Sequence, residues 1–187
     1  QGVSSAASDV YKRQGMNAAL KDFAKKQFPD SKSDLFAMFI ERGFDWCKDS
    51  GFNSMVTMQS WMFLSSYEAM REKLLQDRTL SCMVHMGNGV MGIAFGTAAT
   101  VMLNKHISDY EGSFSYCEND DVNEDGVPKQ FPVQNERLKT AKPDDFKKIP
   151  GSPVAYWVSE KVREIFENSS SMGDISNAVV GLSLIHI

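Results

Sequence analysis

The hydrophobic pattern between residues 35 and 104 alternates between helical and extended periodicity, and this order restricts the fold more than any other feature. Apolar residues recur every three or four positions from Leu35 to Cys47, which predicts a helix with one apolar face. Strands are predicted at 52–58, 79–86 and 97–104, with a second helix at 67–77. The order helix, strand, helix, strand, strand favours an α/β sheet that closes with an antiparallel hairpin.

Residues with known preferences for helix ends suggest where these two helices begin and stop. Ser33 suits the N-cap of the first helix and Gly51 its end, while Ser65 or Ser66 suits the N-cap of the second. Weaker patterns predict a further helix at 15–28, a strand at 112–117 and a helix at 159–167.

Both ends of the chain resemble translated adapter DNA from transposase-based sequencing libraries. Residues 9–14 are DVYKRQ and residues 182–187 are LSLIHI. One frame of AGATGTGTATAAGAGACAG encodes the first peptide, and the reverse complement, CTGTCTCTTATACACATCT, encodes the second. A natural flexible tail is the alternative. We therefore interpret residues 1–14 and 182–187 as adapter-derived and expect the native segment at 15–181, with both true termini missing.

Composition and charge exclude several classes of protein. The 187 residues are 42% apolar and 24% charged, as in an ordinary globular domain or a piece of one. No apolar run approaches the roughly 20 residues of a membrane span, so no membrane partner is expected. Three scattered cysteines indicate reduced thiols in the cytoplasm, and the net charge of −4 argues against a chain built mainly to coat nucleic acid.

The glycine-rich stretch 87–96 and the histidines offer two candidate sites, and neither is favoured. The stretch lacks the Gly-Lys-Ser/Thr ending of a phosphate-binding loop and precedes a strand, so a flexible loop is the better prediction. His85 and His106 lack the spacing of metal ligands, and no Cys or His pair accompanies them. We therefore expect no metal site.

A cluster of cations near the C-terminal third has two interpretations. Arg137, Lys139, Lys142, Lys147 and Lys148 could contact DNA phosphates, or could form the solvated face of a helix. The solvated helix face is the favoured interpretation.

Residues 34–75 carry motifs of a known enzyme family. They resemble amino-methylating DNA adenine methyltransferases, in which a helix of the type D/N-L-Y/F-x-x-F-L/I-E-+ precedes a turn, a strand with its loop and a second helix. Here these parts are DLFAMFIER, KDSG, SMVTMQSWMF and YEAMREKLL. HMGNGVMGIAFGTAATVMLNKH resembles the closing hairpin of that family, and FKKIPGSPVAYWVSEKVREIF resembles its junction with a target-recognition region. The similarity is greatest to the large PglX-type methyltransferases of bacteriophage exclusion (BREX) systems.

This resemblance implies a fold, a reaction and partners. The fold would be the C-terminal half of a class I S-adenosylmethionine-dependent (Rossmann-like) methyltransferase domain. Residues 15–105 would belong to the catalytic domain, 106–167 to a connecting region, and 168–181 to the start of the target-recognition region. The reaction would be methyl transfer from S-adenosylmethionine to adenine N6 in double-stranded DNA, with the adenine flipped out of the helix. Other phage-defence proteins are candidate partners.

The resemblance also assigns site residues, one by one. The catalytic Asn/Asp-Pro-Pro-Tyr/Phe motif is expected upstream of Gly15, so we expect no catalytic residue here and no activity of this segment alone. Phe39 matches an aromatic that contacts the adenine ring of the cofactor, and Leu35 would line the same pocket. Core packing is the alternative for Phe39. Phe95 lies near the aromatic that contacts the target base, whereas Gln59 and Ser60 depart from the usual Pro-containing loop and have no assigned role.

Three alternatives stay open. The intact protein could be a fused restriction–modification enzyme with a nuclease domain outside this segment. It could be a non-catalytic methyltransferase-like module that binds DNA or a partner. The segment could also lack a folded state, because the first strands of its sheet would be missing.

Overall fold

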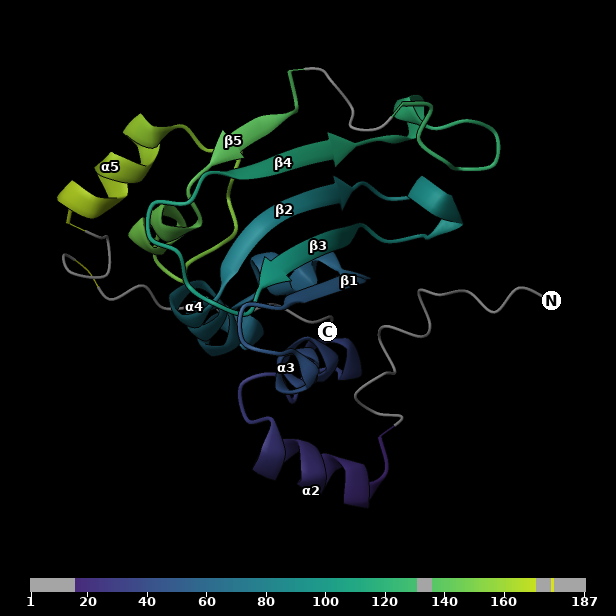
Figure 1. The fold of residues 1–187 in the computed structure, drawn as a ribbon, viewed down its shortest axis with the longest axis vertical. Coiled ribbons are helices and arrows are strands. Elements are labelled where there is room, and N and C mark those ends of the chain that lie inside the picture. Colours follow the sequence, from purple (N-terminus) through teal and green to yellow (C-terminus); the bar gives the residue numbers. More distant parts are fainter. Residues whose placement is uncertain (1–15, 131–135, 171–175, 177–187) are drawn as a thin grey trace, which may run out of the picture.

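A computed structural model describes residues 16–130, 136–170 and 176. The two stretches that we interpret as adapter-derived lie outside these residues, as does most of the expected start of the target-recognition region. Gly15, the expected first native residue and the position upstream of which the catalytic motif is expected, lies outside them too. Figure 1 shows a twisted sheet with most of the helices beneath it and the C-terminal helix beside its last strand.

The sheet has five strands in the spatial order β1-β3-β2-β4-β5. Their bounds are Phe52–Met58 (β1), Thr79–Met86 (β2), Thr97–Leu103 (β3), Gly112–Cys117 (β4) and Lys139–Ala141 (β5). β3 is antiparallel to both β1 and β2, and therefore β1 and β2 run parallel to each other with β3 between them. β4 continues the parallel direction beside β2, and β5 is antiparallel to β4. The predicted α/β sheet with an antiparallel β2–β3 hairpin is confirmed.

Four α-helices and five short 3-10 helices complete the described segment. The α-helices are Ala18–Gln27 (α2), Leu35–Trp46 (α3), Glu68–Asp77 (α4) and Glu160–Asn168 (α5). The 3-10 helices are Gln59–Met62 (η1), Ser65–Tyr67 (η2), Val90–Gly92 (η3), Asn119–Asp121 (η4) and Pro143–Lys148 (η5). All four predicted helices are confirmed, although the first begins at Ala18 rather than at Gly15 because Asn17 caps it through its side chain. Residues 87–96 form a loop with one 3-10 turn.

The predicted caps of the next two helices are wrong. Asp34, whose backbone is extended, occupies the N-cap of α3, and α3 ends at Trp46 because Cys47 already has an extended backbone. Neither predicted serine caps α4, because the chain turns through η2 and places Tyr67 at the N-cap.

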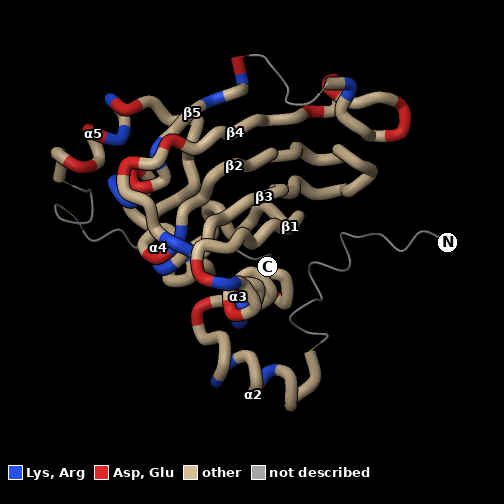
Figure 2. Tube along the Cα trace, in the orientation of Figure 1, with Lys and Arg blue, Asp and Glu red and all other residues tan. Residues whose placement is uncertain are grey.

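The core lies between one face of the sheet and the helices. Side chains alternate along each strand, so Met83 and Phe114 point into this core while Cys82 and Val84 lie on the opposite face. The opposite face is a shallow, mainly apolar groove among the described residues, and Val56 there is 59% exposed. Figure 2 shows that β1, β2 and β3 carry no Lys, Arg, Asp or Glu, whereas acidic residues gather in the loop after β4.

The carboxyl ends of β1, β2 and β4 lie at one edge of the sheet. Met58 and Met86, the last residues of β1 and β2, both pair with Thr97, and Met86 also pairs with Cys117 at the end of β4. In open α/β sheets this edge is where ligands bind. The loops at this edge are therefore the first place to look for a site.

No helix among the described residues has the length and apolar character that a membrane span requires.

Candidate functional site

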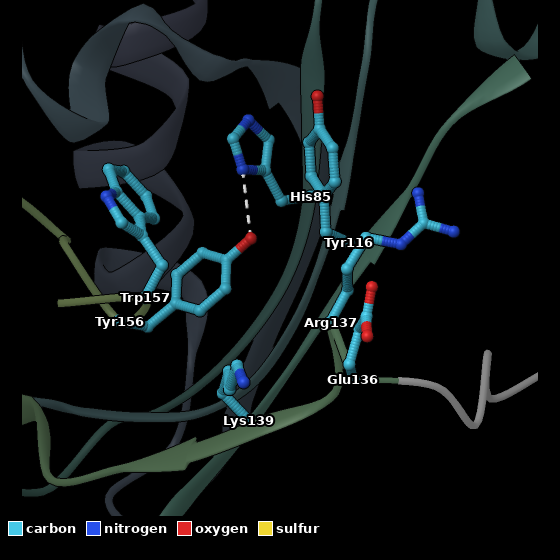
Figure 3. Close-up of a pocket in the computed structure, with 7 residues that line it drawn as sticks. All are labelled: His85, Tyr116, Glu136, Arg137, Lys139, Tyr156 and Trp157. Carbon is cyan, nitrogen blue, oxygen red and sulfur yellow. Dashed lines mark hydrogen bonds between the residues drawn. The ribbon is translucent and has the colours of Figure 1, made fainter. Parts of the chain in front are cut away.

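A pocket of about 320 Å³ opens beside the carboxyl ends of β2 and β4 (Figure 3). We call it the His85 pocket. It is lined by His85, Tyr116, Glu136, Arg137, Lys139, Tyr156 and Trp157. His85 and Tyr116 are the penultimate residues of their strands and pair with each other in the sheet, so both rings stand at the same edge. Their ring centroids are 4.9 Å apart in an edge-on contact, and the rings of Tyr156 and Trp157 are 5.0 Å apart.

His85 is a neutral, doubly hydrogen-bonded side chain. Its Nε2 donates to Oε1 of Gln59, because an amide oxygen only accepts, and the Tyr156 hydroxyl donates to Nδ1 over 3.1 Å. Burial lowers the pKa of His85 to about 4 and raises the pKa of Tyr156 above its usual value. Both groups therefore keep their neutral forms at pH 7, and the pocket floor is uncharged.

Gln59 links this pocket to the loop that carries Phe95. The backbone N–H of Gln59 donates to the carbonyl of Gly96 over 3.1 Å. A side chain at Gly96 would collide with the Gln59 amide, so glycine keeps the room that Gln59 needs to reach His85. Gln59, to which the resemblance assigns no role, therefore connects the loop of Phe95 to His85 at the edge of the sheet.

The segment with Tyr156 and Trp157 is held in place by Arg71 of α4. The Arg71 side chain is buried, and its Nε donates to the carbonyls of Gly151 and Ser152 over 3.0 and 3.1 Å. Its Nη1 donates to the carbonyls of Trp61 and Leu64 over 2.8 and 2.9 Å. Burial lowers the pKa of Arg71 from its usual high value. One guanidinium thus joins α4, the loop after β1 and the turn that leads into the His85 pocket.

Most of the cations near the pocket are paired with carboxylates. The partners are Asp121 and Glu118 for Arg137, Asp109 for Lys142, Asp144 for Lys147, and Asp145 for Lys148. Lys139 is exposed on β5 and has no ion-pair partner among the described residues. The interpretation of this cluster as a solvated helix face is right only for Lys147 and Lys148, which lie on the 3-10 helix η5, and is wrong for Lys139, which lies on β5.

The structure brings Leu35 and Phe39 together on the first two turns of α3. They are 42% and 53% exposed and line an apolar groove of about 320 Å³ between α2 and α3. The groove is lined by Leu20, Phe23, Phe28, Leu35, Met38, Phe39, Arg42 and Trp46. Because half of the Phe39 side chain is exposed, plain core packing does not account for it within the described segment.

Phe95 lies apart from both of these places. It is half-buried in the loop between η3 and β3, next to Gly96, and is not among the residues that line the His85 pocket or the α2–α3 groove. No three His, Cys, Asp or Glu side chains of the described ranges are grouped as metal ligands.

The sequence pattern did not identify the His85 pocket. The sequence offers His85 only as a possible metal ligand, and Tyr156 and Trp157 only within the stretch that resembles the junction with a target-recognition region. The available signal was a polar ring at the end of an otherwise apolar strand, in the run TLSCMVHM. Its partner Tyr156 lies 71 positions further along, which no local pattern reveals.

The burial of His85 predicts a pH dependence of stability. Below about pH 6.5 the unfolded chain protonates this imidazole, whereas the folded chain does so only near pH 4. Stability is therefore lost as the pH falls through this window, by about 2 kcal/mol between pH 7 and pH 5 at 1.36 kcal/mol per pH unit. Urea unfolding at the two pH values measures this loss. An equal loss in the His85→Gln variant would contradict the prediction.

Comparisons with known proteins agree with the motifs. The adenine-specific methyltransferase BrxX of Escherichia coli O9:H4 (strain HS) is 45% identical over 172 residues, which cover 90% of this chain. The adenine-specific methyltransferase PglX of Lacticaseibacillus casei (strain Zhang) is 35% identical over 167 residues, which cover 83% of this chain. The chain spans only 14% of the length of each relative.

A family model points the same way. The model of the Eco57I restriction-modification methylases matches residues 11–91, which include the motif-bearing helices α3 and α4 and the strands β1 and β2. The match begins upstream of Gly15, within the stretch that we interpret as adapter-derived. The resemblance to PglX-type methyltransferases is confirmed. The chain belongs to the family of adenine-specific methyltransferases that includes BrxX and PglX.

Proposed function

We propose that this chain is part of a DNA methyltransferase that transfers a methyl group from S-adenosylmethionine to adenine N6 in phage defence. The observation that carries the proposal is the 45% identity, over 90% of the chain, to a protein named an adenine-specific methyltransferase. The parallel β1 and β2 with β3 between them support the C-terminal half of a class I domain. Host DNA as the substrate makes the cytoplasm the expected location.

The cofactor assignment rests on the fit of the α2–α3 groove to an adenine ring. Leu35 and Phe39 offer an exposed aliphatic and an exposed aromatic surface, and Arg42 is the only charged residue among the described residues of the lining. Such a groove suits a flat, largely apolar base. S-adenosylmethionine supplies the methyl group, and the task of these side chains is to bind and orient its base.

The DNA would meet the carboxyl edge of the sheet. There Phe95 stands on the hairpin loop, and Gln59 fixes that loop to the end of β1. We propose that Phe95 contacts the flipped adenine, which must leave the helix to be methylated. Residues 15–105 then form the catalytic part, 106–167 a connecting region that places Tyr156 and Trp157 at the same edge, and 168–181 the start of target recognition. The catalytic tetrapeptide would precede Gly15.

Replacing Phe39 with alanine tests the cofactor site. In a protein of the relatives' full length that carries this segment, S-adenosylmethionine should bind about 5- to 100-fold more weakly. The reason is that an aromatic ring stacked on a base contributes about 1–3 kcal/mol. Isothermal titration gives the affinity, and transfer of labelled methyl groups to adenine N6 in duplex DNA gives the activity.

Phe52→Ala is the matched control, because Phe52 is 63% exposed but is not among the residues that line the α2–α3 groove. It should bind the cofactor as the unaltered protein does. Equal weakening by both substitutions would remove Phe39 from the site, and the absence of N6-methyladenine in the product DNA would overturn the proposed reaction.

A fused restriction–modification enzyme is the second candidate function. The matching family model is named for restriction-modification methylases, which favours it. Incubation of unmethylated duplex DNA with the full-length protein and Mg²⁺ separates the two, since only the fused enzyme cleaves it. A protein that binds DNA but neither methylates nor cleaves it would be the non-catalytic module.

A further inference from the structure

We propose that the His85 pocket binds an unstacked nucleotide of the DNA strand other than the adenine that is methylated. The base would lie among the rings of His85, Tyr116, Tyr156 and Trp157, with its phosphate near Lys139. This inference rests on the proposed function, because it takes DNA as the substrate.

The walls of the pocket suit a flat ring. Figure 3 shows the four aromatic side chains around one opening, from two adjacent strands and from the 151–158 segment. Trp157 remains 53% exposed although large aromatic side chains gain by burial, and its ring centroid is 6.3 Å from that of His85. The volume of about 320 Å³ lies at the lower end of pockets that hold small ligands, about 300–1,000 Å³.

The polar groups of the pocket leave one hydroxyl free to recognise a base. Both ring nitrogens of His85 and the hydroxyl of Tyr156 are used in hydrogen bonds. The Tyr116 hydroxyl has no hydrogen-bond partner among the described residues, and in Figure 3 it points away from Tyr156. A hydroxyl both donates and accepts, so it can bond to the edge of any base.

The charges at the rim place the phosphate near Lys139. Arg137 is already paired with Asp121 and Glu118, and Glu136 beside it carries a negative charge. Lys139 lines the pocket from β5 and is exposed, with no carboxylate paired to it among the described residues. One unpaired ammonium beside an aromatic pocket matches one nucleotide, whose base stacks and whose phosphate is an anion.

The position of the pocket separates it from the methyl acceptor. β3 and β2 stand between β1 and β4, so β1 and β4 are three strand spacings apart, about 14 Å. The proposed cofactor residues Leu35 and Phe39 lie on α3, which packs beneath β1 through the hydrogen bond from Asn53 to the carbonyl of Ile40. Phe95, which we propose for the methylated adenine, is not among the residues that line the pocket, which favours another nucleotide there.

The test uses the full-length protein and a fluorescent 12-nucleotide single strand of thymidines, which contains no adenine. Trp157→Ala should weaken binding about 5- to 100-fold, as expected for the loss of one base stack. Tyr116→Phe, which keeps the ring, should weaken it by a smaller factor. Lys139→Gln should lower the salt dependence of the binding constant by about one phosphate contact.

Phe166→Ala on α5 is the control, because this ring is 48% exposed and lies outside the pocket. It should leave oligonucleotide affinity unchanged. Wild-type affinity in Trp157→Ala would overturn the proposal. If the affinity depended on Trp157 only for strands that contain adenine, the pocket would bind the methylated base instead. That result would also overturn the proposal.

Deoxyadenosine monophosphate distinguishes the source of the nucleotide. The single strand should quench the fluorescence of Trp157 at lower concentrations than the free nucleotide does, and the reverse order would make the ligand a free nucleotide. Methyl transfer is measured separately on the same protein. A protein that transfers no methyl group yet binds the single strand through Trp157 would refute the proposed function and leave the pocket assignment intact.

Discussion

Replacing Arg71 with alanine should lower the free energy of unfolding by about 3–5 kcal/mol. The substitution removes a buried guanidinium that donates to four backbone carbonyls, those of Trp61, Leu64, Gly151 and Ser152. Each buried carbonyl left without a partner costs about 1–3 kcal/mol, and partial relaxation keeps the total below the sum. Urea unfolding followed by circular dichroism measures the change.

Arg42→Ala is the matched control for this experiment. Arg42 also lies on a helix, but its side chain is half-exposed and makes only surface contacts, an ion pair with Asp45 and a contact of its guanidinium with the Trp46 ring at 5.2 Å. Surface pairs of this kind contribute about 0–1 kcal/mol, so the control should lose no more than that. Arg71→Lys should recover little stability, because an ammonium cannot reach the carbonyls of both segments, 61–64 and 151–152, at once. Equal losses for the Arg71 and Arg42 alanine variants would refute the role given to Arg71.

Phe114→Ala should have an effect of similar size, about 3–5 kcal/mol, which is usual for truncating a buried phenylalanine. Phe114 is fully buried on β4 and lies in stacked contact with Tyr156, with ring centroids 5.1 Å apart and an interplanar angle of 12°. It also contacts Phe146 of η5 edge-on at 5.8 Å. The loss therefore loosens the support beneath the His85 pocket as well as the core.

Because Phe114 supports the His85 pocket, Phe114→Ala should also change a second measurable quantity, the pKa of His85. If Tyr156 loses its support, water reaches His85, and the pKa of His85 should rise from about 4 toward its ordinary value. NMR titration of the imidazole reports the pKa directly. Phe114→Leu should lose less stability and keep the pKa low. An unchanged pKa in Phe114→Ala would show that Tyr156 is held by Arg71 and its segment alone.

The order of elements could be predicted from the sequence because it rests on short-range periodicity. The alternation in FNSMVTM and TLSCMVHM and the apolar face of LFAMFIERGFDW led to β1, β2 and α3 at nearly their observed bounds. The caps could not be predicted in the same way. Ser33 and Ser65 have the right side chains, but the backbone of the preceding turns decides which residue is extended at the N-cap.

The candidate site residues fall into the same two groups, those that short-range spacing predicts and those that depend on the whole fold. Leu35 and Phe39 lie one turn apart on a helix, so spacing alone brings them together. His85, Tyr116 and Tyr156 come from β2, β4 and a distant segment, and they meet only because β4 pairs with β2 and Arg71 holds residues 151–152. The pairing of strands and the partners of a buried arginine depend on the whole fold, and no pattern in the sequence gave a sign of them.

The place of β3 between β1 and β2 also determines when this sheet can form during synthesis. β1 leaves the ribosome first, yet its partner residues on β3 lie 39 to 51 positions further along the chain. At about 5–20 residues per second, the nascent strand waits roughly 2–10 s for that partner. During this interval the apolar side chains of β1 are available to chaperones, and translation speed through residues 59–103 influences how much of the chain reaches the native sheet.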